Sequence, residues 1–278
     1  MPGTLYLIPT PIGNLGDLSA RTIETLSTVD FIAAEDTRVT IKLLNHLGLK
    51  KKLVSYYRHN TETSGAAVLD RLISGESCAL VTDAGTPAIS DPGEDLVALC
   101  ASHDVPVVAL PGPCALVTAL SVSGLPTGRF TFEGFLAMNR KNRRAHLEEL
   151  REERRTMIFY EAPHKLVSTL RDFLEFFGPE RRISLCRELT KLHEEVRRTT
   201  LGEAVEWYGQ NPPRGEFVLV LEGCSPRQED SPDVDAALEK VLRLREDGSS
   251  LKEASRRVSA ETGISRNALY ELALGKNL

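Results

Sequence analysis

The sequence predicts an α/β fold, with two α/β domains at residues 1–122 and 123–224 and a small helical unit at residues 235–278. Three observations support this prediction. Short apolar runs alternate with segments of helical periodicity over the first two parts. Several of these runs end in loops rich in Gly and Pro, which is typical of ligand-binding sheet edges. A stretch rich in Pro, Ser and acidic residues, residues 225–233, reads as a linker before the last unit.

Strand and helix signals alternate along the first domain, which predicts βαβ units and a mostly parallel sheet. The strand candidates are residues 4–8, 31–34, 78–81 and 105–110. The helix candidates are residues 19–27, in which Ile23 and Leu26 share a face, residues 39–47, which Gly48 closes, and residues 91–102.

The second domain opens with a predicted linker at residues 123–134, which is rich in Gly and Pro. A highly charged stretch at residues 140–155 is expected to be a surface loop that leads into a helix. Further elements are expected as strands at residues 156–160, 182–186 and 216–221 and as a helix at residues 164–177, which ends at Gly178.

The composition is that of an ordinary globular protein and excludes several functional classes. With 41% hydrophobic and 26% charged residues over 278 positions, the chain can bury a full core in each domain. Its apolar runs are far shorter than a bilayer span, and its N-terminus lacks the basic and apolar regions of a signal peptide. We therefore expect no membrane association and a cytoplasmic location.

The cysteines and the net charge add two further constraints. The five cysteines are scattered and form no Cys-x-x-Cys pair, which indicates reduced thiols and no metal site. A net charge of −5 argues against general electrostatic affinity for nucleic acid. Any contact with RNA therefore has to come from local basic patches.

Three loops follow predicted strands and are candidates for ligand binding. Residues 9–16 and 111–115 combine Pro, which restricts the backbone, with Gly, which lets a ligand approach it closely. Residues 83–93 place acids, hydroxyls, Gly and Pro before a helix, although this loop could also be a simple turn in which Asp91 caps the helix. Dinucleotide and P-loop motifs are absent, so the loops favour an uncharged or cationic ligand held by backbone groups.

A set of sequence strings occurs in order along the chain: LYLIPTPIGNLGDLSART, AAEDTR, TDAGTPAISDPG, LPGPCALVTALSVSGLP, FEGF, FYEAPHKL, RELTKLHEE and GEFVLVLEG. Together they closely resemble the ribosomal RNA small-subunit methyltransferase I family of the tetrapyrrole-methylase superfamily, over residues 4–223 and more weakly beyond. The resemblance implies S-adenosylmethionine as the cofactor, bound in the cleft between the two α/β domains, and a homodimer. It also implies methyl transfer to the ribose 2′-hydroxyl of a cytidine in the decoding region of 16S ribosomal RNA, either naked or in the small ribosomal subunit.

The chain departs from the family's usual residues at four positions. Thr82, Cys114 and Ala162 stand where the family has serine, and Val39 stands where it has histidine. The first three changes are conservative in size and leave the implied cofactor site intact. The last change argues against a catalytic side chain at position 39.

The resemblance implies cofactor contacts from loops of both domains. Apolar walls suit an adenine ring, and carbonyl dipoles and carboxylates suit the positive charge of a sulfonium. The implied cofactor-binding residues are Pro11, Ile12, Asp83, Ala84, Gly85, Thr86, Ile89, Pro111, Gly112, Cys114, Ala115, Tyr160, Glu161, Glu216 and Phe217.

A ribose hydroxyl is a weak acid, so its attack needs a base or a cation that stabilises the alkoxide. We favour Glu35 as the base, because it follows an apolar strand directly, and Arg38 as the alternative, a cation at the alkoxide. Asp36 is expected to cap a helix. The other candidates are Arg187, Glu188 and Lys191. The histidines His59, His164 and His193 are expected to be solvated or at a helix start.

RNA contacts are expected at clusters of basic residues. The sharpest cluster consists of Arg140, Lys141, Arg143 and Arg144, and Arg38, Lys42 and residues 50–52 form a second. The C-terminal unit predicts a helix-turn-helix, with a turn at residues 262–265 and Leu269 and Leu272 on the second helix. Its exposed cations would be Arg256, Arg257, Arg266 and Lys276, unless the unit is only a packing appendage.

Two other functions are compatible with the sequence. One is a small-molecule methylase that acts on a tetrapyrrole, which would need neither the basic cluster at residues 140–144 nor the C-terminal unit. The other is a non-catalytic RNA-binding factor for ribosome assembly, because the sequence contains no unmistakable catalytic side chain.

Overall fold

The computed structural model describes residues 1–58, 60–224 and 233–275, in two compact units. One unit is Met1–Cys224 and the other is Ser225–Leu278. Most of the predicted linker at residues 225–233 lies outside the described residues, as do His59 and Lys276.

The first sheet is entirely parallel and has the strand order β3-β2-β4-β1-β5. Every residue of β2 and β4 is buried, as expected for central strands of a parallel sheet covered on both faces. This arrangement confirms the parallel sheet predicted for the first 120 residues. The strands are β1 (Leu5–Leu7), β2 (Phe31–Ala34), β3 (Lys52–Ser55), β4 (Cys78–Val81) and β5 (Val107–Ala109).

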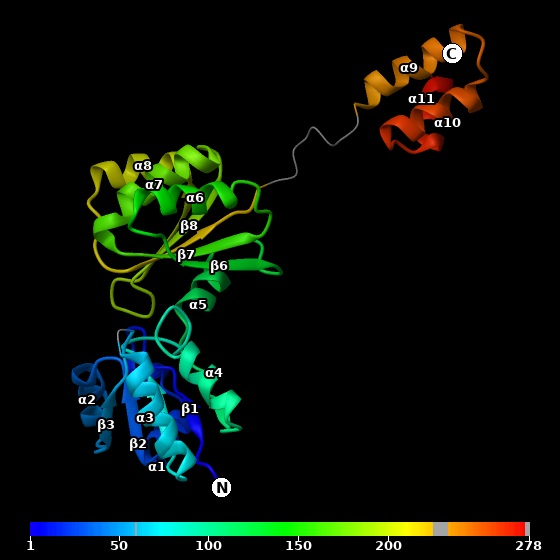
Figure 1. The fold of residues 1–278 in the computed structure, drawn as a ribbon. Helices are drawn as coiled ribbons and strands as arrows, with labels where there is room; N and C mark the ends of the chain where they lie inside the picture. Colours follow the sequence, from blue (N-terminus) through cyan, green and yellow to red (C-terminus); the bar gives the residue numbers. More distant parts are fainter. Residues whose placement is uncertain (59, 225–232, 276–278) are drawn as a thin grey trace. The chain divides into compact units, whose positions relative to one another are not determined.

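Helices cover both faces of this sheet (Figure 1). One face packs against α1 (Ala20–Thr28) and α2 (Thr37–His46), and the other packs against α3 (Thr61–Ile73) and α4 (Glu94–Ser102). Asp36 caps α2 by accepting a hydrogen bond from the Arg38 backbone N–H, as predicted.

Three expectations for this region are corrected. In α1 the buried pair is Thr22 and Leu26, and Ile23 is exposed. Asp91 is not the cap of α4, because that helix begins three residues later and follows Gly93. Strand β3 and helix α3 were not predicted from the sequence. The partly exposed edge strand β3 lacks a continuous apolar run, and α3 carries a glycine, Gly65, in its interior.

The second sheet is mixed, with the order β6-β7-β10-β8-β9, in which only β6 and β7 pair in parallel. Its strands are β6 (Phe130–Phe135), β7 (Thr156–Glu161), β8 (Arg182–Arg187), β9 (Glu195–Thr200) and β10 (Phe217–Leu221). Because β10 is antiparallel to both neighbours, its first residue, Phe217, lies opposite Glu161 and Arg187 at the ends of β7 and β8. One edge of the sheet therefore collects two strand ends and one strand start.

One face of the second sheet packs against α6 (Arg140–Glu149), α7 (Pro163–Phe177) and α8 (Leu201–Gln210), which lie together in Figure 1. The opposite face packs against α5 (Ala115–Val122), which directly follows the third loop of the first sheet. The connection through α5 therefore places the loops of the first sheet beside the second sheet.

Two predicted loops in this region are regular elements. Residues 130–134 of the expected linker belong to β6, and the charged stretch is helical from Arg140 to Glu149, with Asn139 as the cap of α6. Strand β9 and helix α8 were not predicted from the sequence. Strand β9 is half-exposed and carries charges, so it has no apolar run to indicate a strand.

The C-terminal unit contains α9 (Val234–Glu246), α10 (Leu251–Thr262) and α11 (Arg266–Gly275) around a small apolar core. The predicted sequence of helix, turn and helix is confirmed by α10 and α11. On α11 the buried residues are Leu269 and Ala273, whereas Leu272, expected in the core, is exposed. Among the residues described, no helix has the length and apolarity needed to cross a membrane.

Candidate functional site

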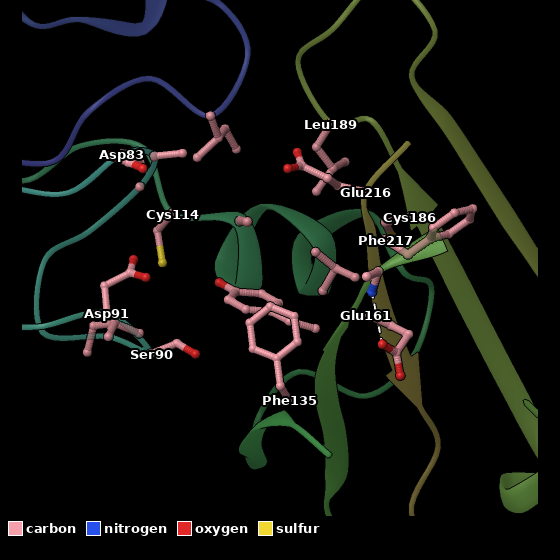
Figure 2. Close-up of a pocket in the computed structure, with 18 of the residues that line it drawn as sticks. Asp83, Ser90, Asp91, Cys114, Phe135, Glu161, Cys186, Leu189, Glu216 and Phe217 are labelled. Carbon is pink, nitrogen blue, oxygen red and sulfur yellow. Dashed lines mark hydrogen bonds between the residues drawn. The ribbon is translucent and has the colours of Figure 1, made fainter. Parts of the chain in front are cut away.

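A cavity of about 450 Å³, here called the main cavity, lies where the loops of the first sheet face the edge of the second (Figure 2). Its first wall comes from the first sheet and its loops, and its second wall comes from β6–β10 and their loops. The first wall comprises Ile12, Glu35, Asp83, Ala84, Gly85, Thr86, Ile89, Ser90, Asp91, Cys114 and Ala115. The second wall comprises Phe135, Tyr160, Glu161, Ala162, Pro163, Cys186, Glu188, Leu189, Lys191, Glu216, Phe217 and Val218.

The loops of the first wall follow the carboxyl ends of parallel strands, which meet at one edge of the sheet. Hydrogen bonds join them to one another. The backbones of Thr10 and Gly85 form a two-way bridge, with N–O distances of 2.9 and 3.0 Å. The Thr86 hydroxyl donates to the Pro113 carbonyl over 3.0 Å. The three loops singled out in the sequence therefore form one connected wall.

The loop after β4 has a strained backbone where it faces the cavity. Ala88 and Ser90 have φ values of 67° and 69°, in the left-handed region that residues with a Cβ rarely adopt. Arg58 donates to the Ser90 carbonyl over 3.2 Å. This conformation presents Ser90 and Asp91 to the cavity (Figure 2).

The first wall carries three carboxylates that line the cavity, those of Glu35, Asp83 and Asp91. In the described part of the chain, none of them forms an ion pair. Burial raises the pKa of Asp91 to about 6, and the negative charges of Glu35 and Asp83 add to this effect. Burial also raises the pKa of Glu35 and of Asp83 above their ordinary values. The backbone N–H of Asp83 donates to Glu35 over 3.3 Å, which only partly offsets the burial of Glu35.

The carboxylates of the second wall that surround Lys191 are neutralised. Its ammonium lies 2.9 Å from Glu188 and 2.7 Å from Glu216. The hydrogen bond from Lys191 lowers the pKa of Glu188. Burial lowers the pKa of Lys191, but the bonds to Glu216 and Glu188 outweigh it and leave that pKa raised. This lysine is therefore shared by two carboxylates of its own wall.

Aromatic side chains make the second wall partly apolar. The Tyr160 ring packs edge-on against Phe132 and Phe135, with ring centroids 5.0 and 5.6 Å away. Its hydroxyl accepts a hydrogen bond from the backbone N–H of Leu116 at the start of α5. Burial raises the pKa of Tyr160, so this phenol stays neutral.

The two walls touch at Gly13. A Cβ at this position would lie 2.4 Å from Lys191 Cγ and 2.9 Å from Thr190 Oγ1. Only a residue without a side chain allows the loop of residues 9–16 to approach the turn after β8 this closely. The contact holds the Lys191 turn against the first wall.

Most of the cofactor-binding residues implied by the resemblance line the main cavity, including members from both walls. Pro11, Pro111 and Gly112 do not line it. A Cβ on Gly112 would lie 2.8 Å from the Pro9 side chain, so this glycine is needed where two loops pack closely. Pro11 lines a neighbouring cavity instead.

The two predicted catalytic residues lie in different places. Glu35 lines the main cavity, whereas Arg38 does not. The Arg38 side chain is 87% exposed and pairs with Asp36 over 2.6 Å. This pairing, with the backbone hydrogen bond at the cap, lowers the pKa of Asp36 to about 2.

The second wall contains residues that the sequence analysis did not propose. Phe135, Cys186, Leu189 and Val218 lie on or beside strands whose apolar character indicates only burial. Phe135 closes the FEGF string, which is the one available signal. Ser90 and Asp91 fall in a loop that was singled out, but they were not named as binding residues.

The basic cluster predicted to bind RNA lies on α6, and half of it is paired. Arg143 contacts Asp172 at 2.5 Å and Thr169 at 2.8 Å, and Arg144 pairs with Glu175 at 2.6 Å. Arg140 and Lys141 form no hydrogen bond or ion pair through their side chains within the described residues. They are therefore the members left to contact an external phosphate.

Comparison with known proteins identifies the family. The model for Tetrapyrrole (Corrin/Porphyrin) Methylases matches residues 4–205, and that for the RsmI C-terminal HTH domain matches residues 230–277. A protein of Synechocystis sp. named ribosomal RNA small subunit methyltransferase I is 46% identical, over 98% of both chains. The protein of that name in Escherichia coli O157:H7 is 44% identical, over 98% of this chain and 95% of its own. The chain belongs to the ribosomal RNA small subunit methyltransferase I family.

Solved structures show that this chain has the tetrapyrrole-methylase fold, as predicted. The methyltransferase CobJ matches with a TM-score of 0.59 and 16% identity, over 82% of this chain and 97% of its own. Uroporphyrin-III C-methyl transferase from Thermus thermophilus, solved in complex with S-adenyl homocysteine, matches with a TM-score of 0.56 and 19% identity, over 79% and 97%. Within the described residues, no group of three or more His, Cys, Asp or Glu side chains is arranged to hold a metal ion.

Proposed function

We propose that the protein transfers a methyl group from S-adenosylmethionine to the ribose 2′-hydroxyl of a cytidine in the decoding region of 16S ribosomal RNA. The observation that carries this proposal is the main cavity, in which unpaired carboxylates face an aromatic wall. Family membership supports ribosomal RNA as the substrate. The nucleotide and its position rest on the sequence resemblance.

The cofactor is S-adenosylmethionine, and the residues of the main cavity fit it. The volume of about 450 Å³ lies in the range of small-molecule sites. Tyr160, Phe135 and Ile12 offer apolar surface for an adenine ring. The carboxylates of the first wall favour a cation, and the lysine of the cavity, Lys191, is already paired with acids. When bound, this cofactor supplies a methyl carbon that a ribose oxygen attacks while the electron pair of the carbon–sulfur bond leaves on sulfur.

The chain's own contribution is positioning and acceptance of a proton. The connected loops of the first wall hold the backbone groups in fixed positions, and alignment of this kind can supply on the order of 7–11 kcal/mol of the barrier. We propose Glu35 as the acceptor of the hydroxyl proton, and Asp91 as a second candidate for the same role. A base whose pKa is near the working pH is effective, and the pKa of Asp91 is about 6. Arg38 lies outside the lining residues, so it is proposed as an RNA contact rather than a group at the reacting atoms.

The decisive experiment is to map ribose methylation on 16S ribosomal RNA from cells with and without the gene. We expect one 2′-hydroxyl to lose its methyl group when the gene is deleted and to regain it in vitro with purified protein, S-adenosylmethionine and small subunits. An unchanged methylation map would contradict the proposal. It would favour a tetrapyrrole methylase or a non-catalytic assembly factor instead.

We also propose the homodimer and the cytoplasmic location that the resemblance implies. Sedimentation equilibrium should give twice the chain mass of 30.6 kDa at micromolar concentration. A monomer mass at that concentration would argue against the dimer. Cell fractionation should recover the protein with the ribosomes and free cytosol.

A further inference from the structure

A second cavity, of about 340 Å³, lies directly beside the main one, between the loop of residues 9–16 and helix α2. The two cavities share Asp83 as a lining residue. The loop between them contributes to both, because Ile12 lines the main cavity while Pro11 and Gly13 line the second. A ligand in the second cavity would therefore lie next to a ligand in the main cavity, with Asp83 at the boundary.

The lining of the second cavity combines an apolar surface with cations. Val39 and Leu43 from α2 and Leu15 from the loop supply the apolar surface. Lys42 and His46 supply a cation and an imidazole. Neither of these two side chains has a hydrogen bond or ion pair within the described part of the chain. An unpaired lysine beside an apolar hollow suits a ligand that is flat and apolar at one end and anionic at the other.

Helix α2 carries a third basic residue, Arg38, in line with Lys42 and His46. Arg38, Lys42 and His46 are spaced four residues apart, so they lie along one face of the helix. This cationic stripe runs from Arg38, beside the shared Asp83 boundary, along the second cavity. Arg38 is paired with Asp36 but largely exposed, so its remaining donors can still reach an external phosphate.

We propose that the second cavity receives the target nucleotide of the RNA, with its base against Val39 and Leu43 and the adjoining phosphates on the cationic stripe. This inference rests on the proposed function and adds the substrate site to it. The base would leave its stack to enter the cavity, as bases do in enzymes that modify single nucleotides. Its ribose would then lie at Asp83, whose backbone N–H contacts Glu35, the proposed proton acceptor.

A bulky substitution tests the cavity directly. Val39→Trp should fill it, because Val39 lines it and is partly exposed, whereas Ile41→Trp adds the same bulk to α2 at an exposed position that lines neither cavity. With small subunits or a 16S ribosomal RNA fragment as substrate, we expect Val39→Trp to lower kcat/KM at least tenfold. Affinity for S-adenosylmethionine, measured by calorimetry, should stay within twofold of wild type, and Ile41→Trp should match wild type in both measurements.

A second variant tests the stripe without adding bulk. Lys42→Ala should weaken RNA binding and reduce the slope of log affinity against log salt by about 0.7, the value for one phosphate contact on a single strand. Arg21→Ala, which removes an exposed cation of α1 away from both cavities, should leave the slope unchanged. This measurement decides the proposal even if Val39→Trp fails to fold.

The outcomes separate this inference from the function on which it rests. If wild type methylates the RNA and neither Val39→Trp nor Lys42→Ala differs from it, the nucleotide binds elsewhere and only this inference is overturned. If Val39→Trp lowers cofactor affinity as much as methylation, the second cavity is not a separate substrate site. If wild type binds S-adenosylmethionine but methylates no RNA, the proposed function fails and this inference fails with it.

Discussion

The first and second walls of the main cavity both carry carboxylates, but the two sets are held differently. In the first wall, Glu35 and Asp91 have no ion-pair partner among the described residues, and burial raises the pKa of each. In the second wall, Lys191 pairs with Glu188, and the pKa of that acid is lowered. The same chemical group therefore gains a proton more readily on one side of the cavity and less readily on the other.

This difference follows from how each wall is built. The first wall gathers loops from the carboxyl ends of parallel strands, so acids from separate segments converge, and in the described residues none of them forms an ion pair. The second wall follows an antiparallel edge, where Glu188, after β8, and Glu216, before β10, lie close enough to share Lys191. Unpaired buried charge costs stability, and groups with pKa values raised in this way concentrate at functional sites, which supports the proton-accepting role proposed for the first wall.

Removal of the unpaired carboxylates should have the largest effect on activity. Glu35→Gln and Asp91→Asn each keep the side-chain shape but remove its basicity. If one of them accepts the proton, that variant should lower single-turnover methyl transfer by roughly 10² to 10⁴. Affinity for RNA should hardly change, because the contribution is made in the transition state. Cofactor affinity should fall much less than the rate, because two of the three carboxylates that favour a cation remain.

Glu188→Gln provides the matched variant on the paired wall. Because Glu188 is already neutralised by Lys191, its loss should slow transfer far less than the loss of Glu35 or Asp91. If neither Glu35→Gln nor Asp91→Asn slows transfer tenfold, positioning alone carries the reaction. The contrast between the walls would then have no catalytic meaning.

Obstruction of the first wall should have the next largest effect, on cofactor binding. Thr86→Arg places a long cation in the main cavity, where Thr86 now donates to the Pro113 carbonyl. We expect calorimetry with S-adenosylmethionine, in excess chelator, to show affinity reduced by at least about tenfold, which is 1.4 kcal/mol. Thr28→Arg, at the exposed end of α1, should bind like wild type. Unchanged affinity for Thr86→Arg would show that the cofactor binds elsewhere.

The pH dependence should report the raised pKa of the first wall. Below a pH of about 6 Asp91 becomes protonated, so single-turnover transfer should fall by up to about tenfold per pH unit between pH 6 and 5. The free energy of unfolding should depend on pH in the opposite direction. The folded state binds the proton more tightly than the unfolded chain, whose pKa is near 3.8, so the free energy of unfolding falls as pH rises from about 4 to 6. Asp91→Asn should remove the part of this decrease in the free energy of unfolding that comes from Asp91. Rates that stay constant from pH 8 to 5 would contradict the assignment.

The smallest expected effect is on the free energy of unfolding, through a hydrogen-bond network that lies behind the second wall. Arg143 donates to Thr169, whose hydroxyl in turn donates to the buried carboxylate of Glu161. Arg143→Ala removes the donor to the Thr169 hydroxyl and to Asp172, while Glu161 keeps its bonds from Thr169 and from the Ala162 backbone N–H. This variant should lower the free energy of unfolding by about 1–3 kcal/mol. Arg140→Ala, on the same helix, should change it by less than about 0.5 kcal/mol. Equal effects in urea denaturation would show that the network does not stabilise this wall.

Much of the fold could be predicted from local patterns. The runs that form β1, β2, β4, β7, β8 and β10 are short and apolar, and the caps and glycines mark helix ends. The elements that were missed, β3, β9, α3 and α8, do not carry such a pattern or lie between stronger signals. Residues 130–134 were assigned to a linker because Gly124, Pro126 and Gly128 dominate the composition just before them.

The site was predictable only in part. The loops of the first wall have unusual composition, so Ile12, Thr86 and Cys114 could be named from the strings that contain them. Residues of the second wall such as Cys186 and Val218 lie in ordinary apolar strands, and nothing in their local sequence separates a cavity-lining position from a core position.

The sequence by itself determined the apolar strands, the rigid loops at their ends and the family, because each of these is encoded in neighbouring residues. Only the tertiary structure decided which charges meet. Among the described residues, it brought Glu35, Asp83 and Asp91 together without an ion pair to any of them, and it paired Arg143 and Arg144 with α7 although all the cations of their cluster look alike in the sequence. The physical reason is that electrostatic energy depends on distance and burial, and both arise from the packing of segments far apart in the chain.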